Sequence, residues 1–233
     1  MEWKDAARRK AAVEAVNNVE RDMVVGLGTG RTVEYAIKEM GRKVREEGLE
    51  ILGVPTSYQT LHLAVKEGIP LTTLDEHPLL DSAIDGADEV DSRLNLLKGA
   101  GGALTREKIV DANARIFIVI VDEDKLVDKL GKNHQVPVEV LPFALAPVEL
   151  SLKRLGGKPL LRLGEKKMGP VITDNGNFIV DVDFGLIENP EELDREIHQV
   201  PGVLETGLFP GFADIVYVGG RGEVRKLERT RNI

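Results

Sequence analysis

The stretch from residue 85 to residue 107 combines carboxylates, a lysine and a glycine-rich turn. Its acidic residues are Asp85, Asp88, Glu89, Asp91 and Glu107. Lys98 directly precedes the small residues 99–102, and Glu107 follows near the start of a predicted helix. Carboxylates this close together alter one another's pKa, which suits acid–base chemistry. The stretch is therefore the first candidate for a functional site.

The acidic cluster has three interpretations that stay open from the residues alone. Hard cations bind groups of carboxylates, but the spacing does not match an EF-hand loop and no histidine lies nearby. A solvated surface turn is the second interpretation. In the third, Asp85 and Asp88 work as an acid–base pair, while Glu89 and Asp91 are helpers or plain surface residues.

The turn after Lys98 is the sharper signal. Small residues at 99–102 let backbone amides approach a ligand closely, with an ammonium group beside them. Glu107, taken alone, would be a first-turn acid that interacts favourably with the helix dipole. Together with the aspartate pair and Lys98, it becomes a candidate for catalysis.

Three further segments could contact a ligand. The glycine loop Gly26–Thr32 follows a predicted strand and opens a helix, which suits either phosphate or sugar binding or simple packing. It matches neither the dinucleotide fingerprint nor a P-loop. Ser57 is expected to be a helix N-cap. Lys125 is either a surface charge or a phosphate ligand.

The first half of the chain alternates strands and helices. Strands are predicted at 23–27, 51–55, 71–74, 83–85 and 115–121, with helices at 3–19, 33–48, 59–67 and 104–112. This order predicts a Rossmann-like, doubly wound, mostly parallel α/β sheet. Ligands bind at the carboxyl ends of such strands, so the residues that follow them should meet at one edge. These residues are Thr29, Ser57, Asp85 and Asp122.

The second half predicts a smaller α+β domain. Its elements are strands at 136–140, 159–163, 171–173, 178–182 and 203–208 and helices at 143–155 and 191–199. The segments 171–173 and 178–182 are expected to form a hairpin around Asp174–Asn177. The order matches the ferredoxin-like β-α-β-β-α-β pattern. Strand 215–218 would return to the first sheet. We predict a catalytic domain of residues 1–131 and 209–233 and a ferredoxin-like domain of residues 132–208.

Composition excludes several classes of function. The net charge of −8 argues against a nucleic-acid binder, and the chain has no cysteine for a thiolate nucleophile or a Cys-based metal site. No apolar run is long enough for a membrane helix, so a cytoplasmic protein without membrane partners is expected. The histidines are scattered without metal-ligand spacing and are expected to be non-catalytic.

The motifs in order resemble ribose-5-phosphate isomerase type A over nearly the whole chain. The main ones are GLGTGRT at 26–32, PTS at 55–57, DGADEVD at 85–91, LLKGAGGALTREKI at 96–109 and DEDK at 122–125. Shorter matches follow, such as PVEV at 137–140 and TDNGN at 173–177. The tandem of DGADE and KGAGGALTREK is the specific part of the resemblance, since a glycine loop alone is common.

The resemblance implies an isomerase that interconverts ribose 5-phosphate and ribulose 5-phosphate through an enediolate, without a metal or organic cofactor. It implies that Glu107 is the general base, that Asp85 and Asp88 handle ring opening and hydroxyl protons, and that Lys98 stabilises the enediolate. The implied substrate-binding residues are Thr29, Gly30, Arg31, Thr32, Ser57, Gly86, Ala87, Gly99, Ala100, Gly101 and Lys125. The family also suggests a homodimer or homotetramer.

One position departs from the family pattern, and two other functions compete. Many members carry Ser where this chain has Arg31, which could pair with a phosphate or turn to solvent. A non-catalytic sugar-phosphate sensor is the first competing function, although such a regulator would usually carry a basic DNA-binding helix. The second is another enzyme of similar fold, such as an amino-sugar phosphate isomerase/deaminase or a coenzyme A transferase.

Overall fold

The computed structural model describes residues 2–229, and the chain divides into two compact units. Unit 1 contains the residues up to Ala87, Arg106–Lys125 and the residues from Phe212 onward, and unit 2 contains Asp88–Thr105 and Leu126–Gly211. The predicted catalytic domain, residues 1–131 and 209–233, includes the stretch 88–105, whereas in the structure this stretch packs with the second half of the chain. The assignment of a catalytic and a ferredoxin-like domain with the predicted boundaries stays a prediction.

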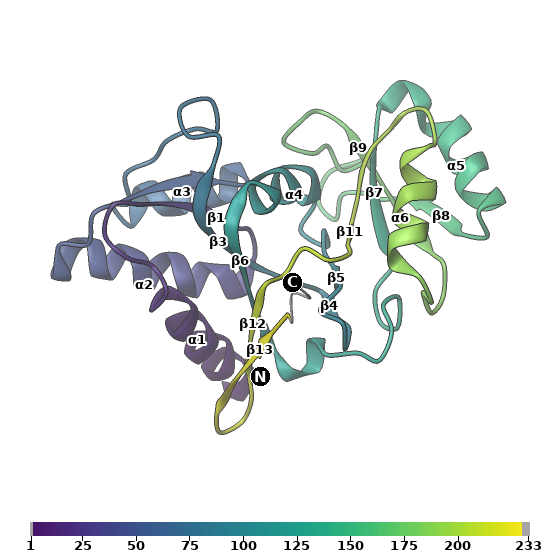
Figure 1. The fold of residues 1–233 in the computed structure, drawn as a ribbon. Coiled ribbons are helices and arrows are strands. Elements are labelled where there is room, and N and C mark those ends of the chain that lie inside the picture. The colour runs from purple at the N-terminus through teal and green to yellow at the C-terminus, as the bar shows by residue number, and fades with distance from the viewer. Residues whose placement is uncertain (1, 230–233) are drawn as a thin grey trace. The chain divides into compact units, whose positions relative to one another are not determined.

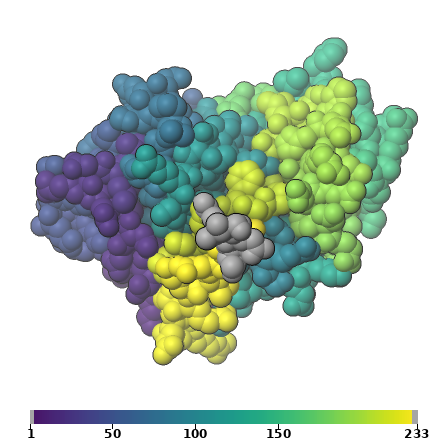
Figure 2. All heavy atoms as spheres, viewed as in Figure 1, coloured from purple at the N-terminus to yellow at the C-terminus, as the bar shows by residue number. Residues whose placement is uncertain are grey.

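Unit 1 is built on a six-stranded sheet of order β13-β12-β6-β3-β1-β2. Its strands are β1 (Met23–Leu27), β2 (Ile51–Pro55), β3 (Leu80–Gly86), β6 (Ala114–Asp122), β12 (Ile215–Gly219) and β13 (Val224–Glu228). Neighbouring strands from β2 to β12 pair in parallel, and β13 adds an antiparallel edge. The predicted parallel α/β sheet and the return of the C-terminal strand are confirmed. The β12–β13 hairpin, yellow in Figure 2, lies on the surface in that view.

Helices cover both faces of this sheet (Figure 1). They are α1 (Glu2–Val16), α2 (Arg31–Glu47), α3 (Tyr58–Lys66) and α4 (Leu104–Ala112), with a short 3-10 turn, η1, at Glu123–Lys125. Val25 and Leu27 of β1 join the core formed with α1 and α2. Gly26 points the other way, where an added Cβ would lie 2.5 Å from Val110 of α4. The glycine therefore lets α4 pack closely on the sheet.

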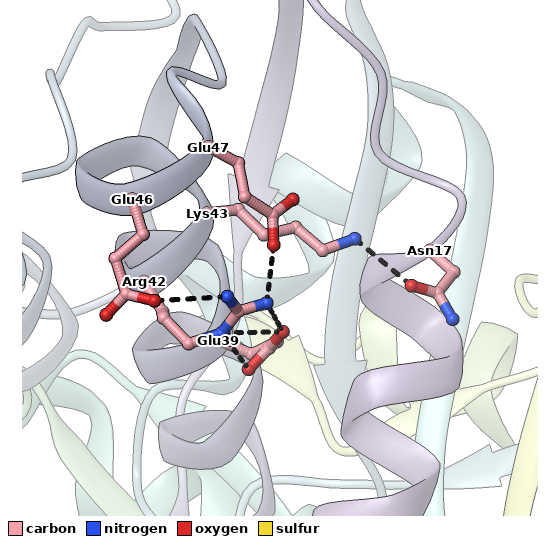
Figure 3. Close-up of polar contacts among 6 residues, drawn as sticks. All are labelled: Asn17, Glu39, Arg42, Lys43, Glu46 and Glu47. Carbon is pink, nitrogen blue, oxygen red and sulfur yellow. Dashed lines mark hydrogen bonds and ion pairs between the residues drawn. The ribbon is translucent and has the colours of Figure 1, made fainter.

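The outer face of α2 carries a cluster of ion pairs, drawn in Figure 3. Arg42 contacts Glu39 at 2.6 Å, Glu46 at 3.3 Å and Glu47 at 2.8 Å. The hydrogen bond from Arg42 lowers the pKa of Glu39. On the same side Lys43 donates to Asn17, just beyond α1, over 3.1 Å. These contacts keep the polar face of α2 outward while its apolar face enters the core.

Unit 2 contains a four-stranded antiparallel sheet of order β10-β7-β9-β8. Its elements are β7 (Val136–Val140), η2 (Pro142–Ala144), α5 (Leu145–Arg154), β8 (Lys158–Leu161), β9 (Phe178–Asp183), α6 (Pro190–His198) and β10 (Val203–Thr206). The order and alternation confirm the ferredoxin-like pattern. Aliphatic side chains of β7 and β9 pack with α5 and α6 in a second core. A three-stranded sheet completes the unit, with β4 (Glu89–Val90), β5 (Leu96–Leu97) and β11 (Leu208–Phe209).

Three predicted strands were wrong in detail. Residues 71–74 form only an isolated bridge between Leu71 and Gly53 before the chain turns. Residues 171–173 are not a strand, because β9 pairs with β8 and 173–177 close a tight turn in which the Thr173 amide donates to Asn177. The run 203–208 splits into β10 and β11, since the chain leaves the sheet at Gly207. Strand β13 was not predicted from the sequence.

Glu89 and Asp91 are buried structural acids, so the alternative that they are plain surface residues was wrong. The Glu89 carboxylate accepts hydrogen bonds from four backbone amides, those of residues 131, 132, 133 and 134, over 2.5–3.3 Å. Asp91 accepts from the amides of Arg93 and Asn95 at 2.8 and 2.9 Å. Each acid thus fixes a stretch of backbone that lacks regular secondary structure.

Among residues 2–229, no helix combines the length and the apolar composition that a membrane span requires.

Replacing Glu89 by Gln tests its structural role. The change keeps the side-chain volume but turns an amide NH₂ group toward backbone N–H donors, which leaves buried donors without acceptors. We expect the free energy of unfolding to fall by about 2 kcal/mol in urea denaturation. The matched control is Glu188→Gln, an exposed acid paired with Lys129, which should change stability by less than about 0.5 kcal/mol. Equal stability of the two variants would contradict this role for Glu89.

Candidate active site

Asp85 lies at the carboxyl end of β3 and is fully buried. Its Oδ1 atom accepts hydrogen bonds from the Thr29 amide at 3.1 Å and from the Gly86 amide at 2.7 Å. A Cβ on Gly28 would lie 2.2 Å from the carboxyl group, so only glycine allows the loop after β1 to approach so closely. The loop and the aspartate therefore form one unit, as the sheet-edge argument predicted.

A cluster of hydroxyl groups ties the same loop to the start of α3. Thr29 Oγ1 lies 2.7 Å from Thr56 Oγ1, 2.8 Å from Ser57 Oγ and 3.2 Å from Thr60 Oγ1. Ser57 caps α3, because its Oγ accepts from the Thr60 amide at 3.1 Å. The predicted N-cap is confirmed, and it also holds Thr29 in place.

The N-terminus of α2 has no side-chain cap, unlike the N-terminus of α3. Gly30 is the N-cap of α2, with φ of 119°, and no side chain caps this helix end. The first helical residue, Arg31, is exposed, and no ion pair to it occurs among residues 2–229. Amides of an uncapped first turn attract anions. Thr32 follows in the same turn.

The remaining unit 1 residues lie on α4 and after β6. Glu107 is in the first turn of α4 and is only 4% exposed, so the plain helix-dipole explanation does not account for its burial. Lys125 ends η1 and is half-buried. Asp122 was expected at the sheet edge with the others. Its Oδ2 instead accepts from Arg8 of α1 at 2.6 and 2.7 Å, which gives it a structural partner.

In unit 2, Asp88 is joined to the glycine-rich turn. Its Oδ2 accepts from the Ala100 amide at 2.9 Å, and its own amide donates to Leu97 O at 2.8 Å. Gly99 has φ of 100°, a left-handed conformation that favours glycine. The turn thus brings its amides toward an acidic side chain, in the way the small residues at 99–102 suggested.

Lys98 is a buried lysine, 2% exposed. Its backbone amide donates to Gly207 O at 2.8 Å, which sets the position of the residue. Its ammonium lies 5.4 Å from the centre of the Phe209 ring, a distance at which a cation is attracted to the ring face. An ammonium group buried in this way can stabilise negative charge strongly, because little water screens it.

Thr105, the second residue of α4, is fixed by Glu139 of β7, a carboxylate that is 1% exposed. Thr105 Oγ1 donates to Glu139, which also accepts from Thr173, Asn175 and Asn177. All four donors are neutral. Glu139 was not singled out from the sequence, because nothing in its local pattern reveals its burial.

The predicted site residues divide between the two units. Thr29, Ser57, Asp85 and Gly86 are brought together in unit 1, and Asp88 and Ala100 in unit 2. The chain passes from unit 1 to unit 2 after Ala87 and returns at Arg106. In sequence, the candidate acids lie beside these two points: Asp85 and Asp88 lie on either side of the first, and Glu107 lies just after the second.

Comparison with known proteins gives consistent matches. The family model of ribose 5-phosphate isomerase A (phosphoriboisomerase A) matches residues 52–223. Ribose-5-phosphate isomerase A of Methanosarcina acetivorans is 54% identical over 225 residues, covering 96% of this chain and 95% of the relative. The corresponding protein of Methanothermobacter thermautotrophicus is 53% identical over 222 residues, covering 95% and 97%.

Solved structures agree in fold. Ribose 5-phosphate isomerase A of Methanocaldococcus jannaschii has a TM-score of 0.93 at 50% identity, covering 96% of this chain and 98% of its own. A D-ribose-5-phosphate isomerase in complex with phospho-erythronic acid has a TM-score of 0.95 at 49% identity, covering 97% and 99%. These likenesses extend over both units of the chain.

A second polar cluster lies outside these residues, on α6 and β10. Asp194, His198 and Glu205 place ligand atoms within 4.8 Å of one another, which makes them a group that could hold a metal ion. This group was not predicted from the sequence, because Asp194 and His198 are four residues apart on a helix while Glu205 comes from a strand. His198 Nδ1 faces Asp194 O and Nε2 faces Glu205 Oε1, both at 2.8 Å. Two oxygen acceptors favour the doubly protonated ring.

His198 should make stability depend on pH. The hydrogen bond to Glu205, followed by that to the Asp194 carbonyl, raises its pKa above 6.5. The folded state therefore holds the proton more tightly, so the stabilisation is complete below about pH 6.5 and is lost as pH rises through the raised pKa. We expect wild type to melt above His198→Gln at pH 6 and the difference to shrink by pH 9. The control is His62→Gln, which replaces an exposed histidine of α3. If the difference in melting temperature between wild type and His198→Gln did not change with pH, the raised pKa of His198 would be contradicted.

Proposed function

The chain belongs to the ribose 5-phosphate isomerase A family of aldose–ketose isomerases, and we propose that it interconverts D-ribose 5-phosphate and D-ribulose 5-phosphate through an enediolate. The observation that carries the proposal is the buried Glu107 in a chain that also retains Asp85, Asp88 and Lys98. A relative of 49% identity binds phospho-erythronic acid, a phosphorylated four-carbon sugar acid, which supports a sugar phosphate as substrate.

Glu107 is proposed as the general base. Its carboxylate takes the proton from C2 of the open-chain aldose, and the electron pair of that C–H bond forms the C1–C2 double bond of the enediolate. Glu107 then returns the proton to C1, while a proton moves from the O2 hydroxyl to O1. The burial of Glu107 supports this role, because a base shielded from water keeps the proton for transfer to the adjacent carbon.

Asp85 and Asp88 are proposed to serve ring opening and the hydroxyl protons. The sugar phosphate is mostly cyclic, so the ring must open first: one carboxylate accepts the proton of the anomeric hydroxyl, the C1–O4 bond breaks, and the ring oxygen O4 takes up a proton to become a hydroxyl. Backbone amides orient both groups, through Thr29 and Gly86 for Asp85 and through Ala100 for Asp88. Such fixed orientation supports proton transfer, since it removes the cost of arranging the acid during the reaction.

Lys98 and the turn that follows it are proposed to stabilise the enediolate. Negative charge develops on the carbonyl oxygen when the C2 proton leaves, and a nearby ammonium and amide N–H groups lower the energy of that charge. Lys98 is buried, and no acceptor for the amides of Gly99 and Gly101 occurs within residues 2–229. These amides are thus suited to meet the substrate oxygens.

The substrate phosphate is proposed to bind at the first turn of α2. The uncapped amides there, the exposed Arg31 and the hydroxyls of Thr29 and Thr32 are suited to an anion. Lys125 is proposed as a further contact, since it follows β6 at the same end of the parallel sheet. Gly30 supplies the turn that this binding needs.

The wider setting of the activity is also a proposal. We place the enzyme in the cytoplasm, in the non-oxidative pentose phosphate pathway, as a homodimer or homotetramer without a metal or organic cofactor. The decisive assay follows ketulose formation from ribose 5-phosphate in the presence of EDTA. A sensor would bind the sugar without turnover, and an amino-sugar phosphate enzyme or a coenzyme A transferase would leave it unchanged. A fraction of the product should carry deuterium from solvent D₂O at C1 if an enediolate forms, because exchange at the shielded Glu107 carboxyl is slow but not blocked.

Replacing Glu107 by Gln should remove the base while keeping the shape of the side chain. We expect kcat to fall by about 10²–10⁴-fold with a small change in KM, because the amide cannot accept the C2 proton. Initial rates with ribose 5-phosphate measure this effect. Glu14→Gln, an exposed acid of α1, should match wild type. Near-normal turnover of Glu107→Gln would eliminate Glu107 as the base.

Replacing Arg31 by Ser tests the phosphate site and restores the residue that many family members carry. The variant loses a charge-assisted contact but keeps the helix amides, so we expect KM for ribose 5-phosphate to rise about tenfold with kcat nearly unchanged. The exposed Arg9 offers a matched control as Arg9→Ser, which should leave both constants unaltered. If KM does not change, the Arg31 side chain plays no part and the amides bind the phosphate alone.

A further inference from the structure

Arg162, just beyond β8, contacts the back of the glycine-rich turn. Its Nη1 donates to Gly99 O at 3.0 Å and to Ala100 O at 3.1 Å. Asp181 of β9 holds the guanidinium from the other side, through Nε at 2.7 Å and through an ion pair with Nη2. The two side chains are 17% and 19% exposed. A two-point pairing of this kind fixes the plane of the guanidinium group.

The two carbonyls that Arg162 contacts belong to two consecutive peptide groups. The Gly99 carbonyl shares its peptide group with the Ala100 N–H, which donates to Asp88 Oδ2 at 2.9 Å. The Ala100 carbonyl shares its peptide group with the Gly101 N–H, for which no acceptor occurs within residues 2–229. Because a peptide group is planar, fixing its C=O also fixes the direction of its N–H.

Arg162 also strengthens these N–H groups as donors. Hydrogen bonds in a chain polarise one another, so a cation at a carbonyl makes the N–H of the same peptide group a better donor. The series runs from Asp181 through Arg162 to the two carbonyls and on to the amides of Ala100 and Gly101.

We propose that Arg162, oriented by Asp181, is a positioning residue that aims and strengthens the amides of Ala100 and Gly101 for catalysis. Through Ala100 it sets the position of the Asp88 carboxylate, and through Gly101 it prepares a donor for the charge of the enediolate. The inference rests on the proposed isomerase function. Neither residue was singled out from the sequence, where both belong to segments predicted to be ordinary strands.

The turn needs such a partner because its own backbone is permissive. Gly99 and Gly102 have positive φ angles of 100° and 80°. Within residues 2–229, the only backbone hydrogen bond inside the turn 99–102 joins the Gly102 amide to Gly99 O. Glycine backbones have many accessible conformations, so an unsupported turn would sample several amide directions. A simple ion pair between β8 and β9 would not require both carbonyls to meet one guanidinium nitrogen.

The test compares Arg162→Gln and Arg162→Lys with Lys158→Gln. Lys158 forms an exposed ion pair with Asp183 between the same two strands, so its loss reports on the strand pairing alone. We expect kcat of Arg162→Gln to fall about 10- to 100-fold, with KM for ribose 5-phosphate within about threefold of wild type. Arg162→Lys should recover part of the rate, because it keeps a cation but loses the planar fork. Lys158→Gln should retain wild-type kinetics.

Inhibition by phospho-erythronic acid provides a second measurement. Its carboxylate carries negative charge like the enediolate, so the inhibition constant should rise in Arg162→Gln by more than KM does. If kcat of Arg162→Gln stays within twofold of Lys158→Gln, the inference is overturned. If Arg162→Gln does not fold, Asp181→Asn decides instead, and wild-type kcat in that variant overturns the inference too. Absence of isomerase activity in wild type would overturn the proposed function itself, which separates the two failures.

Discussion

Buried carboxylates have to be solvated by the protein, and backbone amides supply that solvation at several of them. A carboxylate without hydrogen-bond donors in a dry interior would cost several kcal/mol. Asp85 is held by amides of the loop after β1 and of β3, and Asp88 by an amide of the glycine-rich turn. Glu89 receives the amides of a whole segment at 131–134. The acids therefore determine the course of the loops around them.

This requirement explains the glycines at positions 28 and 99. An amide can reach a buried carboxylate only if the backbone itself comes close, and a side chain often blocks that approach. At Gly28 an added Cβ would meet the Asp85 carboxyl group at 2.2 Å. At Gly99 the positive φ angle turns the chain so that the next amide, that of Ala100, reaches Asp88. These two glycines are thus the counterpart of the acids that they approach.

Local patterns in the sequence predicted those parts of the fold that depend on local physics. The helix at 104–112 and the strand at 136–140 were predicted with the bounds that the structure has. Partners distant in sequence were beyond such reasoning. Burial of Glu89 depends on a segment some forty residues later, and Asp122 meets Arg8 across more than a hundred residues. The candidate stretch 85–107 was singled out because its residue types are unusual together, while its contacts with Glu139 and Arg162 left no local mark in the sequence.

Asp88 and Glu89 show how one short motif can combine a proposed functional acid with a structural one. They are adjacent in sequence, yet Glu89 is fully buried with four amide donors, whereas Asp88 is half-buried and, within residues 2–229, accepts from one amide. A carboxylate that accepts hydrogen bonds from four donors has little capacity left for a substrate. One with a single donor is oriented but keeps lone pairs available. Glu89 fixes the backbone, and the exact placement of its neighbour follows because consecutive side chains of an extended segment point to opposite sides.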